Sequence, residues 1–466
     1  MKKILIPALL AVLAAAPALA QFDGTDLGVS KAAEVAVPEA ADAKALPAAK
    51  AGLKEWTVMV YINGKNDLEL AGLYNVNQME QVGSSSKVNI VVEMGRMNGQ
   101  AQGDAHQDGD WTGSRRYYIT KDKDEEHIHS IKAGDAASVD MGDYKRVVDF
   151  VKWAKDMFPA KRYMLILWNH GSGFMDPRKE RKGISFDDET GNYIRTPQIG
   201  QILREAGKVD VLAFDACLMQ SAEVDYEVKD NVDVIVGSEE TVPALGYPYS
   251  LFLGALVKKP AMDAEQLGAI TVEAYKMFYD KMGKAAQLSA VRASKLEGFA
   301  QRMKDFSALA KDSDAAALKA ARDGVIRYDA VGPSDAKMTI SFYGDAAQFA
   351  KLAADNLKES DKSAAIKQKA EELGAFIDGE LVIYKGASGK NRAGHEMSES
   401  RGISVYLPPA EARISQTRLE GIFEAPYTDF AFDKASGWHD FVTMLYDTAI
   451  APAPVVAPVT AAAPGQ

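Results

Sequence analysis

Residues 163–170 of the chain are YMLILWNH, and residues 209–217 are VDVLAFDAC. In each stretch an unbroken apolar run leads directly into side chains that can carry out chemistry. Such runs are typical of strands that are buried on both faces, as in the parallel sheets of α/β proteins. The two stretches therefore predict two strands of a parallel sheet, with His170 and Cys217 just beyond their carboxyl ends.

Further apolar runs alternate with helical patterns around these two stretches. Predicted strands cover residues 56–62, 88–93, 163–168, 209–214 and 232–236, and predicted helices start near residue 67 or cover residues 144–157, 196–205 and 219–228. Strands of this kind that alternate with helices form mainly parallel sheets with helices on both faces. The sequence therefore predicts an α/β core over residues 54–256.

The second half of the chain, residues 257–448, has a looser pattern. Its predicted helices include residues 263–282 and 295–312, and its strand candidates are residues 288–291, 338–343 and 402–407. Long amphipathic patterns with few strands predict a mostly helical subdomain. The added strands are candidates for extending the first sheet.

Residues 1–20 form a separate segment. Two lysines precede an apolar run that ends at Ala15, and a small-x-small cleavage site ends at Ala20. This order predicts a secretory signal peptide that is removed after Ala20. A spanning helix is disfavoured, because the uninterrupted apolar run is shorter than the ~20 residues that a bilayer requires. We therefore expect a secreted or periplasmic protein without a membrane span.

The composition limits the other regions and the partners. Residues 21–53 are rich in Ala, Pro and charged residues, which predicts a linker or propeptide, and the Ala/Pro-rich residues 449–466 predict a disordered tail. The chain of 466 residues has 54 basic and 65 acidic side chains and a net charge of −11. Because this charge repels polyanions, nucleic acid is not an expected partner. The sequence leaves the oligomeric state open.

Cys217 is the only cysteine in the chain. An unpaired cysteine in an exported protein is a reactive thiol, a partner in an intermolecular disulfide, or a small buried apolar side chain. Its position beyond a strand end favours reactivity, because ligand sites of parallel sheets lie there. His170 is a candidate base or acid that can pair with a thiolate, and the predicted helix start at Cys217 would favour that charge. The backbone amides of Gly171 and Cys217 are candidates for holding an oxyanion.

Several segments of the chain resemble the clostripain family of cysteine peptidases, relatives of the caspases and gingipains. They are VYINGKNDLE (60–69), NHG (169–171), GISFDD (183–188), DAC (215–217), SEE (238–240) and GYPY (246–249). The separation of His170 and Cys217 is close to the ~50 residues typical of caspases. The resemblance covers about residues 54–446. It implies a caspase-like fold and a His170/Cys217 dyad that requires no third acidic member.

The resemblance also implies cleavage after Arg or Lys, with Asp215 as the acidic residue that binds the basic side chain. Residues i and i+2 of an extended chain face the same side, so the Asp215 carboxylate would lie beside Cys217. A substrate guanidinium or ammonium would pair with it there. The alternative is that Asp215 caps the following helix.

Related enzymes often cut themselves between the catalytic histidine and cysteine. The sequence DPRKERKG at residues 176–183 lies between them, and it is polar and basic, so it supplies residues at which an enzyme specific for Arg or Lys could cut. Lys182 is the preferred processing site and Arg181 the next. An ordinary solvated surface loop is the alternative.

Metal binding is less well supported. The resemblance makes calcium possible, with Asp187, Asp188 and Glu189 as candidate ligands, although the chain has no EF-hand loop. His127 and His129 lie among acidic residues, but an exposed charged loop is the favoured interpretation. No cofactor is therefore expected to be required.

Together these features predict an exported cysteine endopeptidase that cleaves protein or peptide substrates after Arg or Lys. Two alternatives stay open. One is a caspase-like peptidase or transpeptidase of other specificity. The other is a catalytically silent binding protein with the same fold.

Overall fold

The computed structural model describes residues 46, 52–100, 103–174, 184–328, 342–391, 394–407 and 427–445. The predicted signal peptide, nearly all of the predicted linker, the loop with Arg181 and Lys182, and the Ala/Pro tail lie outside the described residues. The site predicted around His170 and Cys217 lies within them.

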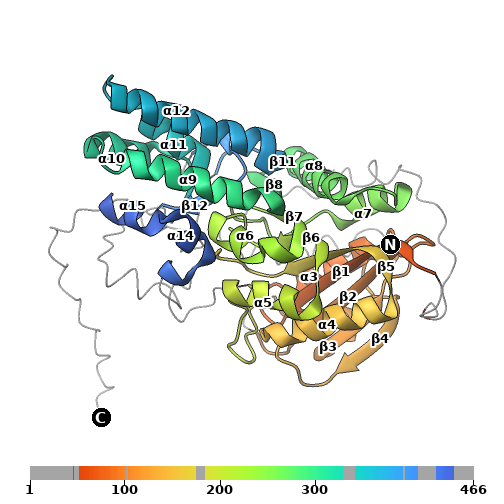
Figure 1. The fold of residues 1–466 in the computed structure, drawn as a ribbon. Helices are drawn as coiled ribbons and strands as arrows, with labels where there is room; N and C mark the ends of the chain where they lie inside the picture. Colours follow the sequence, from red (N-terminus) through yellow and green to blue (C-terminus); the bar gives the residue numbers. More distant parts are fainter. Residues whose placement is uncertain are drawn as a thin grey trace, which may run out of the picture.

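A nine-stranded sheet runs through the molecule in the order β11-β8-β7-β6-β5-β1-β2-β3-β4 (Figure 1). Its parallel centre consists of β1 (Lys54–Gly64), β2 (Val88–Arg96), β5 (Ala160–Trp168), β6 (Val209–Asp215) and β7 (Val232–Gly237). Antiparallel pairs complete each edge: β3 (Gly113–Tyr118) and β4 (Ile131–Ala136) beside β2, and β8 (Ala286–Arg292) and β11 (Val382–Ser388) beside β7. The predicted α/β class and mainly parallel sheet are confirmed.

Helices cover both faces of the sheet because the central strands are apolar on both sides. In β1, Val58 and Val60 pack in one core cluster, whereas Met59 and Tyr61 pack in the other. This alternation is the strand period of two, with both faces buried. The first face carries α3 (Glu69–Glu80), α7 (Tyr249–Lys258) and α8 (Ala264–Met282), and the second carries α4 (Tyr144–Met157), α5 (Thr196–Ala206), α6 (Ala222–Val228) and α9 (Leu296–Ala310).

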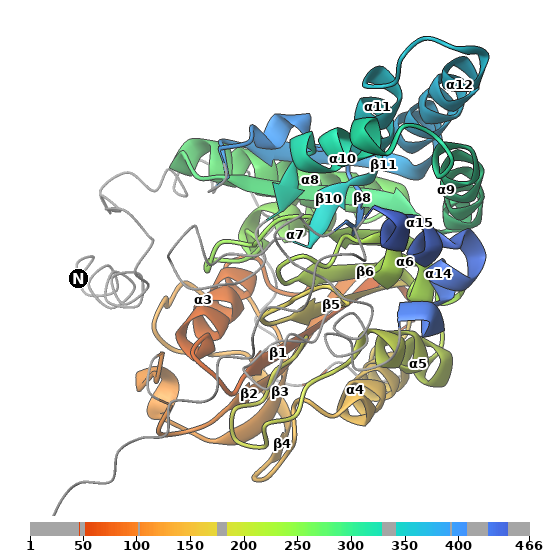
Figure 2. The ribbon, with the colours of Figure 1, turned by 90° about the vertical axis from the view of Figure 1, so that its left-hand side faces the viewer.

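The other helices of the described residues lie on the side of the molecule away from β3 and β4 (Figure 2). They are α10 (Ala315–Gly324), α11 (Ala346–Asp355), α12 (Asp361–Phe376), α14 (Ala431–Ser436) and α15 (Trp438–Met444). A small second sheet joins β9 (Arg327–Tyr328), β10 (Tyr343–Asp345) and β12 (Ser404–Tyr406). Because β8 and β11 also belong to the main sheet, this half of the chain shares a core with the first, and the boundary at residue 256 stays a prediction.

Some elements differ from the sequence prediction. Strands β3 and β4 do not follow from the sequence pattern, since both are short and partly polar and neither has a long apolar run; β4 forms the edge of the sheet and β3 lies between it and β2. The helix predicted from residue 219 begins instead at Ala222, because Ser221 is its N-cap and accepts a hydrogen bond from the Val224 amide. In the described part of the chain, no helix has the length and apolar character that crossing a membrane requires.

Candidate active site

The carboxyl ends of β5 and β6 bring the NHG and DAC segments together. Trp168 pairs with Asp215 in the parallel register, and the Asn169 amide donates to the Asp215 carbonyl at 3.2 Å. A Cβ atom on Gly171 would lie 2.4 Å from the Cys217 carbonyl oxygen, so only glycine permits this close approach. The two predicted segments are therefore in direct backbone contact.

His170 has an acidic partner that the sequence prediction did not include. Its Nε2 lies 2.7 Å from Oδ1 of Asp67, a residue of the connection between β1 and α3. Both side chains are partly exposed, 32% for His170 and 39% for Asp67. The imidazole is therefore accessible and at the same time held from one side by a carboxylate.

The Cys217 thiol is half-buried beneath the segment that follows β7. The Val242 amide donates to Sγ at 3.2 Å, and the Leu218 amide donates to the Glu240 carbonyl at 3.2 Å. Burial first, and then the carboxylates of Glu240 and Asp215, raise the pKa of the Cys217 thiol to about 11, against the hydrogen bonds from the amides of Val242 and Gly171. In this arrangement Cys217 is a neutral thiol at pH 7.

The helix contribution that was expected to favour the Cys217 thiolate is wrong. Helix α6 begins at Ala222, and a turn in which Leu218 has a φ of +61° separates it from Cys217. A helix terminus influences charges only within its own first turn. Residue 218 lies in the left-handed region that non-glycine residues rarely adopt, so the chain turns sharply immediately after the sulfur.

Asp215 ends β6 and lies almost entirely inside the protein, with 4% of the residue exposed. Its Oδ2 accepts hydrogen bonds from the Tyr247 amide and the Tyr249 hydroxyl, both at 3.0 Å. Burial raises the pKa of this carboxyl to about 7, against those two hydrogen bonds. The alternative role as a helix cap is wrong, because Ser221 caps α6.

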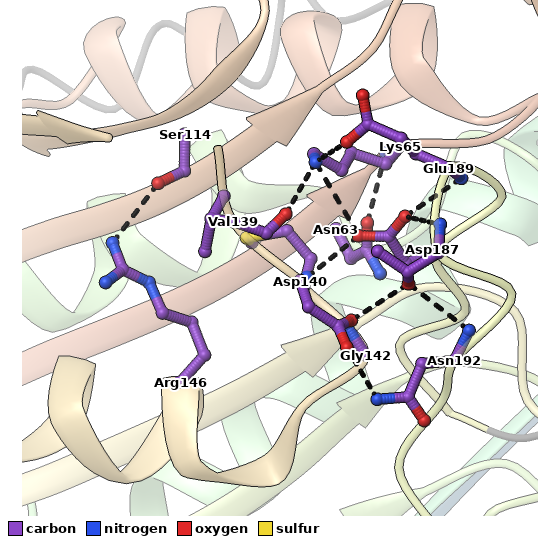
Figure 3. Close-up of polar contacts among 12 residues, drawn as sticks. Asn63, Lys65, Ser114, Val139, Asp140, Gly142, Arg146, Asp187, Glu189 and Asn192 are labelled. Carbon is purple, nitrogen blue, oxygen red and sulfur yellow. Dashed lines mark hydrogen bonds and ion pairs between the residues drawn. The ribbon is translucent and has the colours of Figure 1, made fainter. Parts of the chain in front are cut away.

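A buried lysine fixes the segment after the predicted processing loop (Figure 3). Lys65 Nζ donates to the Val139 carbonyl at 2.6 Å, pairs with Glu189 and lies 3.8 Å from Oδ2 of Asp187. Asp187 also accepts hydrogen bonds from the amides of Met141, Glu189 and Thr190. These contacts attach the acidic segment to the end of β1.

The candidate calcium ligands do not fit a calcium ion in this arrangement. The Lys65 ammonium lies beside the carboxylates of Asp187 and Glu189, and backbone amides donate to the Asp187 oxygens. Calcium needs six to eight oxygen ligands around it and no competing cation. Across the residues that the structure describes, no group of three or more His, Cys, Asp or Glu side chains is arranged to hold a metal ion.

We predict that Lys65→Met destabilises the protein by about 3 kcal/mol, because it leaves the buried Asp187 carboxylate without its cation. Urea unfolding of the variant and the wild type measures the change. Lys132→Met is the matched control: Lys132 pairs with Asp135 at 2.8 Å on the surface, and it should change stability by less than ~1 kcal/mol. An equal effect of both substitutions would contradict the structural role of Lys65.

His127 and His129 belong to an exposed loop. His129 Nε2 and His127 Nδ1 lie 3.0 Å and 3.2 Å from the same Asp124 oxygen. The hydrogen bond to Asp124 raises the pKa of His129. These contacts describe a surface ion-pair cluster.

Sequence reasoning assigned no role to Asp67, Val242, Tyr247 or Tyr249. Asp67 is part of the VYINGKNDLE segment, but 103 residues separate it from His170. Tyr247 and Tyr249 belong to the GYPY segment and reach Asp215 across more than thirty positions. Asp67, Tyr247 and Tyr249 thus lie in segments that the family resemblance includes. The residues that they contact, however, depend on the three-dimensional fold.

Comparisons with known proteins identify the family of the chain. The sequence profile of the Clostripain family matches residues 60–445. Clostripain from Hathewaya histolytica is 27% identical over 212 residues, and this match covers 41% of the chain and 40% of the clostripain sequence.

Two solved structures have the same fold. One is a secreted C11 cysteine protease from Bacteroides thetaiotaomicron in complex with an irreversible peptide inhibitor, with a TM-score of 0.59 and 20% identity. The other is an inactive zymogen C11 protease from Parabacteroides distasonis, with a TM-score of 0.58 and 18% identity. Each likeness covers 83% of this chain and 99% of the solved one, which confirms the caspase-like fold. From the profile match over most of its length, the chain belongs to the clostripain family of cysteine peptidases.

Proposed function

We propose that the chain is an exported cysteine endopeptidase that hydrolyses peptide bonds after Arg or Lys. One observation carries this proposal: the segments with His170 and Cys217 touch at the ends of two parallel strands, and the buried carboxyl of Asp215 ends one of those strands. This common location supports the roles that we propose: Cys217 as nucleophile, His170 as base and Asp215 as the carboxyl that binds the cationic side chain. Export rests on the signal peptide predicted from the sequence.

In the proposed mechanism His170 takes the thiol proton of Cys217, and the sulfur attacks the scissile carbonyl carbon. The backbone amides of Gly171 and Cys217 would hold the oxyanion that forms. The imidazolium then gives its proton to the leaving amine, which breaks the C–N bond and leaves an acyl-enzyme. His170 next takes a proton from water as the water oxygen attacks the acyl carbon. The C–S bond then breaks, which releases the acid product, and the imidazolium returns its proton to the sulfur. No metal or cofactor takes part in these steps.

The high pKa of the thiol supports a resting state before activation. At pH 7 a thiol with a pKa of about 11 is almost entirely protonated, and the Val242 segment lies against it. We propose that cleavage after Lys182, or after Arg181, converts this resting state into the active enzyme. The predicted processing loop follows Phe174, which comes four residues after His170, and precedes Ile184.

We predict that the purified wild type converts to two fragments that separate after Lys182 and hydrolyses Arg- and Lys-amide peptides but not Asn- or Asp-amide peptides. Lys182→Ala combined with Arg181→Ala should leave the chain intact, because the basic side chain needed at the cleaved bond is gone. Intact mass and fluorogenic peptide turnover measure both effects. Arg178→Ala combined with Lys179→Ala is the matched control from the same loop and should process normally.

The other outcomes separate the alternatives. Turnover of Asn or Asp substrates alone would identify a peptidase of other specificity. An unprocessed wild type that neither turns over any peptide nor reacts with a lysyl chloromethyl ketone would identify a silent binding protein.

A further inference from the structure

We propose that Asp67 is a positioning residue that fixes the tautomer of His170, so that Nδ1 is the ring nitrogen that serves Cys217. This inference rests on the proposed function. The dyad implied by the family resemblance contains no such residue. The observation behind it is the 2.7 Å distance between His170 Nε2 and Asp67 Oδ1.

The chemistry of the contact determines where the proton lies. An ionised carboxylate is only an acceptor, so Nε2 of His170 must be the donor and carries hydrogen. A neutral imidazole has one N–H, which leaves the lone pair on Nδ1. When His170 takes the thiol proton on Nδ1, the Asp67 carboxylate stabilises the imidazolium that results. The thiol resists ionisation, since burial raises its pKa to about 11, so this help matters for the reaction.

The contact is built into the fold rather than made by two loose surface side chains. The residue before each partner is an asparagine, and both asparagines bind the backbone of Phe186. Asn66 Nδ2 donates to the Phe186 carbonyl at 2.7 Å. Asn169 Oδ1 accepts from the Phe186 amide at 2.8 Å. Both asparagines are buried. The backbones that carry Asp67 and His170 are therefore tied to one shared residue.

A second set of bonds fixes the two backbones directly. Asn169 Nδ2 donates to the Asn63 carbonyl at 2.6 Å, which joins the His170 segment to the end of β1. The Leu68 amide donates to Asn66 Oδ1 at 3.0 Å, which shapes the turn that carries Asp67. A side chain held on such a rigid platform can orient an imidazole without entering the substrate site.

The exposure of the pair indicates orientation rather than stabilisation of the fold. His170 and Asp67 are 32% and 39% exposed, and ion pairs with that access to water contribute little to stability. Removal of the Asp67 carboxylate should therefore leave the protein folded and lower its catalytic rate. Measuring stability and rate separately tests the role of Asp67.

The decisive variant is Asp67→Asn, which keeps the size of the side chain but can present an amide N–H to Nε2. That donor favours the tautomer with hydrogen on Nδ1, and kcat for an Arg-amide peptide should fall about 100-fold with KM changed less than about twofold. Asp67→Glu restores a carboxylate and should recover activity to within about tenfold of wild type. Asp124→Asn is the matched control, because it removes a carboxylate from another imidazole, His129, at the exposed loop, and it should not change kcat.

A spectroscopic measurement locates the ring hydrogen of His170 independently of turnover. In ¹⁵N-histidine-labelled protein, long-range ¹H–¹⁵N correlation spectra identify the protonated ring nitrogen, and His170→Ala assigns the signal. We expect neutral His170 with hydrogen on Nε2 in wild type and on Nδ1 in Asp67→Asn.

Hydrogen on Nδ1 in the wild type would overturn the proposal, as would an Asp67→Asn variant with wild-type kcat. So would a kcat loss accompanied by an unchanged tautomer and a lowered melting temperature, since that result describes a structural role. If the wild type hydrolyses nothing, the proposed function fails, and the spectrum alone decides on the placement of Asp67.

Discussion

Cys217→Ala is expected to lower kcat/KM for Arg- and Lys-amide peptides by about 10⁴-fold or more. The chain has no other cysteine, and a covalent mechanism loses its first step when the nucleophile is removed. The same substitution should leave the purified chain unprocessed, because self-cleavage uses the same sulfur. Initial rates with micromolar variant and intact mass after long incubation measure the two effects.

A control must show that the loss of activity does not come from unfolding of the variant. Cys217 is half-buried and its Sγ accepts a hydrogen bond from the Val242 amide, so Cys217→Ser preserves size and polarity where alanine removes both. Both variants should keep the thermal unfolding midpoint of wild type within a few degrees. Retention of more than about 1% of wild-type turnover by Cys217→Ala would place the nucleophile elsewhere and contradict the mechanism.

The central strands could be predicted from the sequence because their burial leaves a local trace. Strands β1, β5 and β6 are apolar on both faces, and the runs that end at Trp168 and Asp215 place His170 and Cys217 at the same edge of the sheet. Edge strand β4 has the sequence IKAGDA and no apolar run, since none of its residues is fully buried. Prediction succeeded where both faces of an element are buried.

The partners of the site residues could not be predicted, because they come from distant parts of the chain. Nothing near Asp67 in the sequence indicates a contact with His170, and Asp215 gives no local sign that Tyr249 will bury it. The start of α6 is different: Ser221 is a favoured N-cap residue, so the sequence itself carries a local signal for a helix that begins at Ala222. The contacts of Asp67 and Asp215 depend on the three-dimensional fold, whereas the start of α6 depends on a single local capping residue.

The buried lysine changes the interpretation of the acidic segment at residues 187–189. Three acidic residues in a row suggest a cation, and the structure supplies one from the chain itself, the Lys65 ammonium. Lys65 belongs to the same VYINGKNDLE segment as Asp67. One short connection after β1 therefore anchors the segment after the processing loop and also holds the imidazole of His170.

Asp215→Asn is expected to lower kcat/KM for Arg- and Lys-amide peptides by about 100-fold and to change turnover of the neutral citrulline analogue less than about threefold. The loss reflects the removal of a desolvated charge from an ion pair with the substrate. Asparagine keeps an oxygen for the Tyr247 amide and the Tyr249 hydroxyl, so the fold should persist. Initial rates on the two substrate series measure the change in selectivity.

The pH dependence of the same site has a definite sign. Burial raises the pKa of the Asp215 carboxyl to about 7, so the carboxyl is largely neutral below that pH and ionised above it. Only the ionised form attracts a guanidinium, so KM for an Arg substrate should fall as pH rises through about 7, whereas KM for the citrulline analogue should not. The phenols of Tyr247 and Tyr249, the two described residues whose hydrogen bonds to this carboxyl are given above, stay neutral in this range, since burial raises the pKa of both well above 10. If Asp215→Asn retained the wild-type preference for Arg over citrulline, or the same fall in KM with pH, a different carboxylate would have to bind the basic side chain.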